Sequence, residues 1–195
     1  MRNKVLLIFI LAVLVSFTRA QRPKDLRISG ITEVSHFSNG SLTSYGILVE
    51  YFLNKNFSMN YQYTFGTNQF GNFYAHFPGT VSWLVEAAKH NEDDYSTSVN
   101  DAWEVVLIAT FAIPEGVSFH TYPRKWLEVA PFINPFSADY NILDNEHSTI
   151  TASLGIRSHI KLTSHLSIVP HFGLKYIYKN NQTGTIYGIG LGWLF

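Results

Sequence analysis

The sequence predicts an all-β fold: an eight-stranded antiparallel up-and-down transmembrane β-barrel with one short helix in a long loop. Bulky apolar residues alternate with small or polar ones from residue 25 onward. A period of two is typical of strands whose two faces meet different surroundings. Only 14% of the 195 residues are charged, whereas 15% are aromatic, which is a low charge content for a soluble domain.

The first 20 residues are expected to form a signal peptide. Arg2 and Lys4 precede the apolar run 5–17, and small residues flank Arg19 before a cleavage point at Gln21. The apolar run is shorter than the roughly 20 residues that a membrane-spanning helix needs. We therefore divide the chain into a signal peptide, 1–20, and a membrane β-barrel domain, 21–195.

Composition excludes several classes of protein. The chain has no cysteine, so it forms neither disulfides nor a cysteine-based zinc site. Lys and Arg together number 14, as do Asp and Glu, and this balance gives no basic excess to bind nucleic acid.

Eight segments carry the alternating pattern, an even number as expected for such barrels. They are 25–36, 43–53, 57–66, 102–113, 117–132, 148–162, 166–178 and 185–195. Tight turns are predicted at 54–56, 114–116 and 163–165. If the N-terminus lies on the same side of the membrane as these turns, the connections 37–42, 67–101, 133–147 and 179–184 lie on the other side.

The segment after Phe77 differs from the rest of the chain. Pro78 and Gly79 interrupt the strand pattern, and Val81, Leu84, Val85 and Ala88 recur at helical spacing. This spacing predicts a short amphipathic helix around 81–90.

The last predicted strand has two unlike faces. One face carries Tyr187, Ile189, Leu191, Trp193 and Phe195, and the other is mostly glycine. Bulky residues outward with small residues inward are what a lipid-facing barrel strand requires.

The signal peptide and this strand resemble those of the small eight-stranded outer-membrane β-barrels of Gram-negative bacteria, the OmpA/OmpX-type class. The resemblance implies location in the cell outer membrane, contact with its lipid and lipopolysaccharide, and insertion by the barrel assembly machinery. It also implies that Tyr187, Trp193 and Phe195 form the assembly signal for that machinery. It names no activity.

Charged residues collect on the inward faces of the predicted strands. An eight-stranded barrel is filled by its own side chains, and buried charges must be paired. We therefore expect a lumen charge network in preference to a proton or ion path. Its predicted members are Glu33, Glu50, Glu104, Glu128, Arg124, Arg157, His159, Lys161, His171 and Lys175.

Three inward histidines, His120, His159 and His171, are candidates for a metal site. Their spacing matches no specific ligand pattern, so we predict that they pack the lumen. Accordingly, no metal and no cofactor is predicted.

One trio of residues points to chemistry. His36 and Ser38 lie two residues apart, and Glu50 follows on the next predicted strand. A histidine base, a serine nucleophile and an orienting acid are the groups of acyl transfer. The trio resembles the His-x-Ser-Asn pattern and later Glu of the lipid A 3-O-deacylases, which are outer-membrane barrels. That resemblance implies His36 as base, Ser38 as nucleophile and Glu50 as orienter.

Two functions follow as hypotheses. The first is a non-enzymatic outer-membrane barrel, a structural or docking subunit whose loops 67–101 and 133–147 contact an outer-membrane protein. The second is a lipid A deacylase. The turn-like Ser38-Asn39-Gly40 sequence favours the first, because these residues are typical of a hairpin turn.

Overall fold

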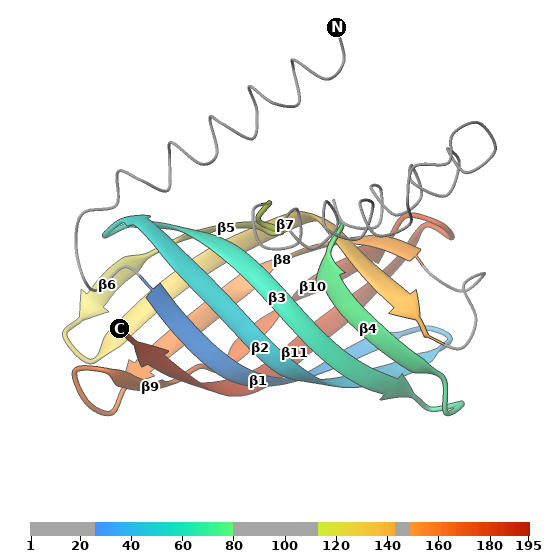
Figure 1. Cartoon of the computed structure of the whole chain (residues 1–195), viewed down its shortest axis with the longest axis horizontal. Coiled ribbons are helices and arrows are strands. Elements are labelled where there is room, and N and C mark those ends of the chain that lie inside the picture. The colour runs from blue at the N-terminus through green and yellow to red at the C-terminus, as the bar shows by residue number, and fades with distance from the viewer. Residues whose placement is uncertain (1–25, 80–112, 143–148) are drawn as a thin grey trace, which may run out of the picture.

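The computed structural model describes residues 26–79, 113–142 and 149–195. Within these ranges, eleven strands form one antiparallel sheet, in which β11 pairs with β1 and so closes the sheet into a barrel (Figure 1). The strands are β1 (Leu26–Phe37), β2 (Gly40–Asn54), β3 (Phe57–Asn68), β4 (Phe73–Pro78), β5 (Gly116–Phe119), β6 (Thr121–Arg124), β7 (Leu127–Asn141), β8 (Thr149–Lys161), β9 (Leu166–Ile168), β10 (His171–Ile177) and β11 (Gln182–Leu194).

These strands occupy eight places in the barrel wall, which we call staves. β4, β5 and β6 share the stave between β3 and β7. β9 and β10 share the stave between β8 and β11. The predicted eight-stranded antiparallel barrel is confirmed, whereas the predicted helix at 81–90 lies outside the described residues.

The strand boundaries of the middle of the chain were predicted wrongly. The predicted strand 117–132 contains most of β5, all of β6 and the start of β7, because the chain turns at Lys125 and Trp126 and β7 then continues to Asn141. The predicted loops 67–101 and 133–147 accordingly contain β4 and the second half of β7. Apolar Val117 and Phe119 before the turn and Leu127 and Val129 after it share one parity, so the alternation alone does not reveal the turn. The predicted strand 102–113 lies outside the described residues except for Ile113, which is not in a strand.

The fourth stave is interrupted partway along its length. Thr64 pairs with His76, so an unbroken β4 would bring residue 80 opposite Asn60. Gly116 stands opposite Asn60 instead. Residues 80–115 are therefore an insertion within a stave whose two halves keep one alignment along β3.

A β-bulge on the neighbouring strand lies at the same level. The register between β7 and β8 shifts between Asn134 and Ser137. Pro135 and Phe136, the two residues in between, are both exposed. A bulge of this kind takes up one extra residue and bends the strand. β7 therefore changes register at the point where the strand beside it is interrupted.

The two ends of the barrel differ. The terminal end carries Leu26 and Phe195, which share a backbone hydrogen bond of 2.9 Å, together with β6 and β9 (Figure 1). The turns at 54–57, 124–127 and 161–166 lie at this end. The opposite end, here called the loop end, carries the connections 37–40, 68–73, 141–149 and 177–182. The structure confirms the turns predicted at 54–56 and 163–165, whereas residues 114–116 lead into β5 and do not join two paired strands.

The outer wall is apolar and the interior is polar. Along β8, exposed Ile150, Leu154 and Ile156 alternate with buried Thr151 and Arg157. β11 has the same arrangement of apolar residues on the outside, where Tyr187, Ile189, Leu191 and Trp193 are exposed. No helix in the described part of the chain has the length and apolar character needed to cross a membrane.

Candidate functional site

An arginine links two carboxylates at the terminal end of the lumen. Arg27 on β1 donates two hydrogen bonds of 2.8 Å to Glu128 on β7 and one of 3.2 Å to Glu50 on β2. The Glu128 Oε1 atom also lies 2.7 Å from Nδ1 of His120, whose Nε2 lies 2.8 Å from Ser58 Oγ. We call these five residues the inner cluster.

A second layer of polar side chains lies next to the inner cluster. Ser118 Oγ accepts a hydrogen bond of 3.1 Å from Arg157 and donates one of 3.0 Å to Asn60. Asn60 in turn donates to Asn134 over 3.3 Å. The Arg157 guanidinium stacks 3.9 Å from the ring centroid of Phe132. This contact places a cation on an aromatic face.

The outer cluster lies towards the loop end and is organised around His76. Its two ring nitrogens lie 2.6 Å from Asp139 and 3.1 Å from Glu115. Because carboxylates only accept hydrogen bonds, a doubly protonated imidazole satisfies both contacts. Ser137 donates to Glu115, and Lys175 Nζ lies 2.7 Å from Asp139.

Glu33 extends the outer cluster. Its Oε2 atom lies 3.3 Å from Nε2 of His171 and accepts a hydrogen bond of 3.4 Å from Gln62. The three layers together carry bonded polar side chains along the lumen. An eight-stranded barrel has room for little more than such side chains, so this arrangement favours a filled interior over an aqueous channel.

Most of the residues predicted for the lumen network are buried there, namely Glu33, Glu50, Glu128, Arg157, His159, His171 and Lys175. Arg124 is not, because it lies on the exposed strand β6 beside the turn at 125–126. Lys161 is half-buried, with Nζ 5.3 Å from the ring of Tyr122. Glu104 lies outside the described residues. Arg157 was expected to pair with a carboxylate, but its guanidinium donates to Ser118 and stacks on the ring of Phe132.

Four charged or titratable members of the network were not predicted from the sequence. Arg27 shares the inward parity of Glu33, and that parity was a usable signal. His76, Glu115 and Asp139 fell in segments predicted as loop or turn, where parity has no meaning. Correct strand boundaries would have placed His76 on β4 and Asp139 on β7, whereas Glu115 precedes β5 and is not part of a strand.

The structure does not bring the trio His36, Ser38 and Glu50 together. His36 Nδ1 lies 2.7 Å from the hydroxyl of Ser41, not of Ser38. His36 pairs in register with Ser41, whereas Glu50 pairs with Arg27. These two pairs are nine positions apart on β1, or roughly 30 Å. His36 and Ser38 line a groove of about 300 Å³ on the outer wall, while Glu50 is buried in the lumen.

The predicted assembly residues all lie on the outer wall. Tyr187, Trp193 and Phe195 are exposed. Trp193 pairs with Ile28 on one side and with Leu166 on the other. The Trp193 ring stacks on His165, with centroids 5.9 Å apart.

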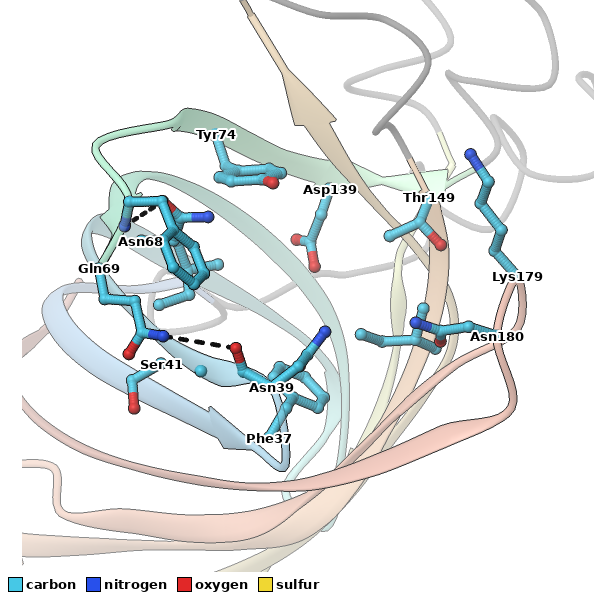
Figure 2. A pocket seen from close by; sticks show the side chains of 14 residues that line it. Phe37, Asn39, Ser41, Asn68, Gln69, Tyr74, Asp139, Thr149, Lys179 and Asn180 are labelled. Carbon is cyan, nitrogen blue, oxygen red and sulfur yellow. Dashed lines mark hydrogen bonds between the residues drawn. The ribbon is translucent and has the colours of Figure 1, made fainter.

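A cavity of about 450 Å³ opens at the loop end (Figure 2). Its lining combines amide and hydroxyl side chains with aromatic rings, namely Asn39, Asn68, Gln69, Asn180, Ser41, Thr149, Phe37, Phe70 and Tyr74. Asp139 connects this cavity to the outer cluster, because its carboxylate also contacts Lys175 and His76. Such a mixture of polar and aromatic groups is typical of a ligand pocket.

Comparison with solved structures identifies the fold. The chain is similar to the N-terminal β-barrel domain of OprF from Pseudomonas aeruginosa, with a TM-score of 0.50 and 11% identity over 86% of this chain and 96% of that one. Neisserial surface protein A gives a TM-score of 0.48 and 8% identity over 87% and 96% of the two chains. Ail, the attachment invasion locus protein of Yersinia pestis, gives 0.44 and 7% over 87% and 96%.

The comparisons by sequence are negative, since no protein-family model and no curated protein matches the chain. The likeness to the OprF domain therefore shows the fold alone. That fold is the eight-stranded barrel of bacterial outer-membrane proteins.

Proposed function

We propose that this chain is a non-enzymatic protein of the bacterial outer membrane, a structural or docking subunit that spans the membrane as a barrel. The observation that carries the proposal is the combination of an apolar outer wall with a lumen occupied by paired polar side chains. The wall of such a barrel anchors the protein in the membrane, and its two ends are available to bind partners.

The outer wall suits a lipid environment. Exposed Phe172, Leu191 and Leu154 are each more than half exposed, at 60%, 58% and 54%, which would be unfavourable in water over so wide an area. β1, β8 and β11 have 12, 13 and 13 residues, and a tilted strand needs about 9–11 to cross a bilayer. The barrel wall is therefore tall enough to span.

Docking is best supported at the loop end. The cavity there presents amide and hydroxyl groups, together with charged Asp139 and Lys179, beside Phe70, which is 72% exposed. The connections 68–73 and 141–149 flank this end and belong to the loops 67–101 and 133–147 proposed for a protein partner. Two further partners are proposed. Lipid and lipopolysaccharide would surround the wall, and the barrel assembly machinery would bind the chain during insertion.

Single cysteines test location and orientation together, since the chain has no cysteine of its own. Phe70→Cys at the loop end should react with a membrane-impermeant maleimide on intact cells. Lys55→Cys at the terminal end should react only after the outer membrane is permeabilised. Labelling of Lys55→Cys alone on intact cells would reverse the orientation, and recovery of the protein outside the outer-membrane fraction would refute the location.

Mass spectrometry of lipid A tests the absence of enzymatic activity. Cells that produce the protein and cells that produce its Ser38→Ala variant should have the same lipid A profile as cells without it. Loss of an acyl chain that requires Ser38 would contradict the non-enzymatic proposal and support the deacylase hypothesis.

A further inference from the structure

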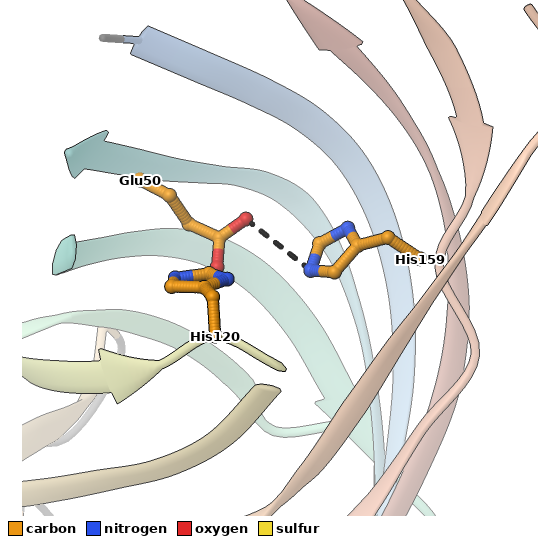
Figure 3. Close-up of side chains that lie close together, drawn as sticks. All are labelled: Glu50, His120 and His159. Carbon is orange, nitrogen blue, oxygen red and sulfur yellow. Dashed lines mark ion pairs between the residues drawn. The ribbon is translucent and has the colours of Figure 1, made fainter. Parts of the chain in front are cut away.

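Three buried side chains from separate parts of the wall converge in the lumen near the terminal end (Figure 3). Glu50 comes from β2, His120 from the link between β5 and β6, and His159 from β8. Their carboxylate and ring-nitrogen atoms all lie within 4.8 Å of one another, and all three residues are fully buried.

Two of these side chains lack the hydrogen bonds that burial demands. Neither ring nitrogen of His159 has a hydrogen-bond partner among the described residues, and the same holds for Oε1 of Glu50. The nearest approach, from His159 Nε2 to Glu50 Oε2, is 3.6 Å, which is too long for a hydrogen bond. Because unpaired buried polar groups are unfavourable, these atoms are candidates for binding a ligand.

We propose that Glu50, His120 and His159 bind one divalent transition-metal ion of the zinc type. Imidazole nitrogens and a carboxylate oxygen are the ligands that Zn²⁺ takes from protein side chains. The ligand atoms of a tetrahedral zinc site lie about 2.0–2.1 Å from the metal, and hence about 3.4 Å from one another. Small side-chain rotations bring the three ligands into this range.

Of the three proposed ligands, His120 must change its contacts most. Its ring nitrogens lie 2.7 Å from Glu128 and 2.8 Å from Ser58, so metal binding replaces one of these contacts. Glu128 is the candidate for a fourth ligand, because its Oε1 atom lies 3.8 Å from His159 Nε2. Its hydrogen bonds from Arg27 then hold that carboxylate in place, as partners of metal ligands commonly do.

The charge of the lumen favours a cation as the occupant. The described residues include five buried carboxylates, Glu33, Glu50, Glu115, Glu128 and Asp139, against three buried cations, Arg27, Arg157 and Lys175. A doubly protonated His76 adds one positive charge, and the interior is still short of another. A bound anion would increase this negative excess, whereas a divalent cation would replace it with an excess of one positive charge.

The ion would link β2, the segment between β5 and β6, and β8 across the lumen. Phe52 packs against His120 with ring centroids 4.7 Å apart, and it is itself buried, so the ion enters most readily while the barrel assembles. Metal that binds only the folded barrel stabilises it in proportion to its concentration.

The test uses residues 21–195, the chain without the expected signal peptide, refolded without a histidine tag in detergent micelles. His36 and His165, which lie nearer the surface, are replaced by Gln to remove adventitious ligands. The protein is refolded with Zn²⁺ or Co²⁺, freed of excess metal, and its bound metal is measured. We expect one ion per chain, a Co²⁺ spectrum typical of a tetrahedral site, and a higher urea midpoint with metal than with a chelator.

Substitution of the ligands then locates the ion. Glu50→Gln and His159→Leu should each weaken binding at least about tenfold, since even indirect partners of metal ligands have effects of 10–100-fold. His171→Gln, which changes a buried histidine of the outer cluster, is the matched control and should leave binding unchanged.

X-ray absorption of the metal-loaded parent protein keeps the proposal testable if the ligand variants fail to fold. It should show two imidazole ligands and one or two carboxylate ligands. Absence of stoichiometric metal in the folded parent, or binding that survives both ligand substitutions, would overturn the proposal and leave water as the occupant of the space.

Discussion

Arg27 holds Glu128 across the lumen through two parallel hydrogen bonds of 2.8 Å each. Both side chains are buried, and a bidentate arginine–carboxylate contact of this kind is strong and orientation-specific. The same guanidinium reaches Glu50 on a third strand. Arg27 thus connects β1, β2 and β7 at one level of the barrel.

Replacing Arg27 by Met should destabilise the barrel by about 3–5 kcal/mol, because two buried carboxylates then lose their shared partner. The measurement is urea-induced unfolding in micelles, followed by tryptophan fluorescence. Arg124→Met on exposed β6 is the matched control and should change stability by less than about 0.5 kcal/mol. Equal stability of the two variants would mean that Arg27 is not part of a buried network.

A glycine on β11 makes room for a lumen histidine. A Cβ atom on Gly188 would overlap the backbone oxygen of Thr32 and lie 2.5 Å from the ring of His171. Gly188→Ala should therefore lower the urea midpoint and disturb the contact between His171 and Glu33. Gly30→Ala should be tolerated, because nothing lies within 4 Å of its added Cβ. Similar midpoints for both variants would contradict the close packing at β11.

The register of the fourth stave predicts that the insertion is separable from the barrel. Deleting residues 80–115 joins Gly79 to Gly116 and continues the pairing of β4 with β3 into that of β5 with β3. His76 loses Glu115 in this variant but keeps Asp139 at 2.6 Å. We expect a folded barrel that still shifts in mobility on heating in a denaturing gel.

Deletion of 80–114 is the control for this experiment. It leaves one additional residue in the strand, and a slip of one residue turns every following side chain to the wrong face. This barrel should form less efficiently or unfold at lower urea concentration. Failure of the 80–115 deletion under conditions where the 80–114 deletion folds would refute the assigned register.

The C-terminal strand should be essential for assembly. β11 pairs with β1 and with β9 through Trp193, and the Phe195 amide bonds to Leu26. Removing 193–195 deletes these contacts at the seam and the aromatic residues proposed as the assembly signal. The truncated protein should accumulate in a protease-sensitive form, whereas Phe70→Ser in a loop-end turn should assemble normally. Heat-modifiable mobility of the truncated protein would contradict this role.

The barrel was predictable from the sequence because alternation is a local property. On β8 and β11, every second residue faces outward in the structure, as the pattern predicts. Successive side chains of a strand point to opposite faces whichever strand it pairs with. The turns beside Asn54 and Thr163 were also found, because their side chains bond to the following backbone amides. These features depend only on neighbouring residues.

The fourth stave was not predictable by the same means. Its halves are separated by residues 80–115, and only pairing with β3 and β7 reveals that they belong together. β4 has six residues, which is too short a run for the alternation to stand out beside Pro78. The membership of Asp139 and Glu115 in the outer cluster follows from that long-range pairing and not from any local pattern.

The trio His36, Ser38 and Glu50 shows the converse limit. Its residue types and spacing fit acyl transfer, but a hairpin fixes which residues meet. The β1–β2 register places Ser41 beside His36 and Arg27 beside Glu50. Spacing along a chain therefore did not predict proximity in the barrel.

The central claim, that the apolar wall faces lipid around a filled lumen, is tested most directly by nitroxide scanning of β8. Single cysteines at positions 150–158 in this cysteine-free chain would be spin-labelled after reconstitution into lipid bilayers. Accessibility to oxygen and to a water-soluble nickel complex would then be measured at each position. We predict that oxygen accessibility oscillates with a period of two, with maxima at Ile150, Leu154 and Ile156 and minima at Thr151 and Arg157. Access of the nickel complex to Leu154 and Ile156 equal to or greater than that of oxygen, or an absence of oscillation, would contradict the claim.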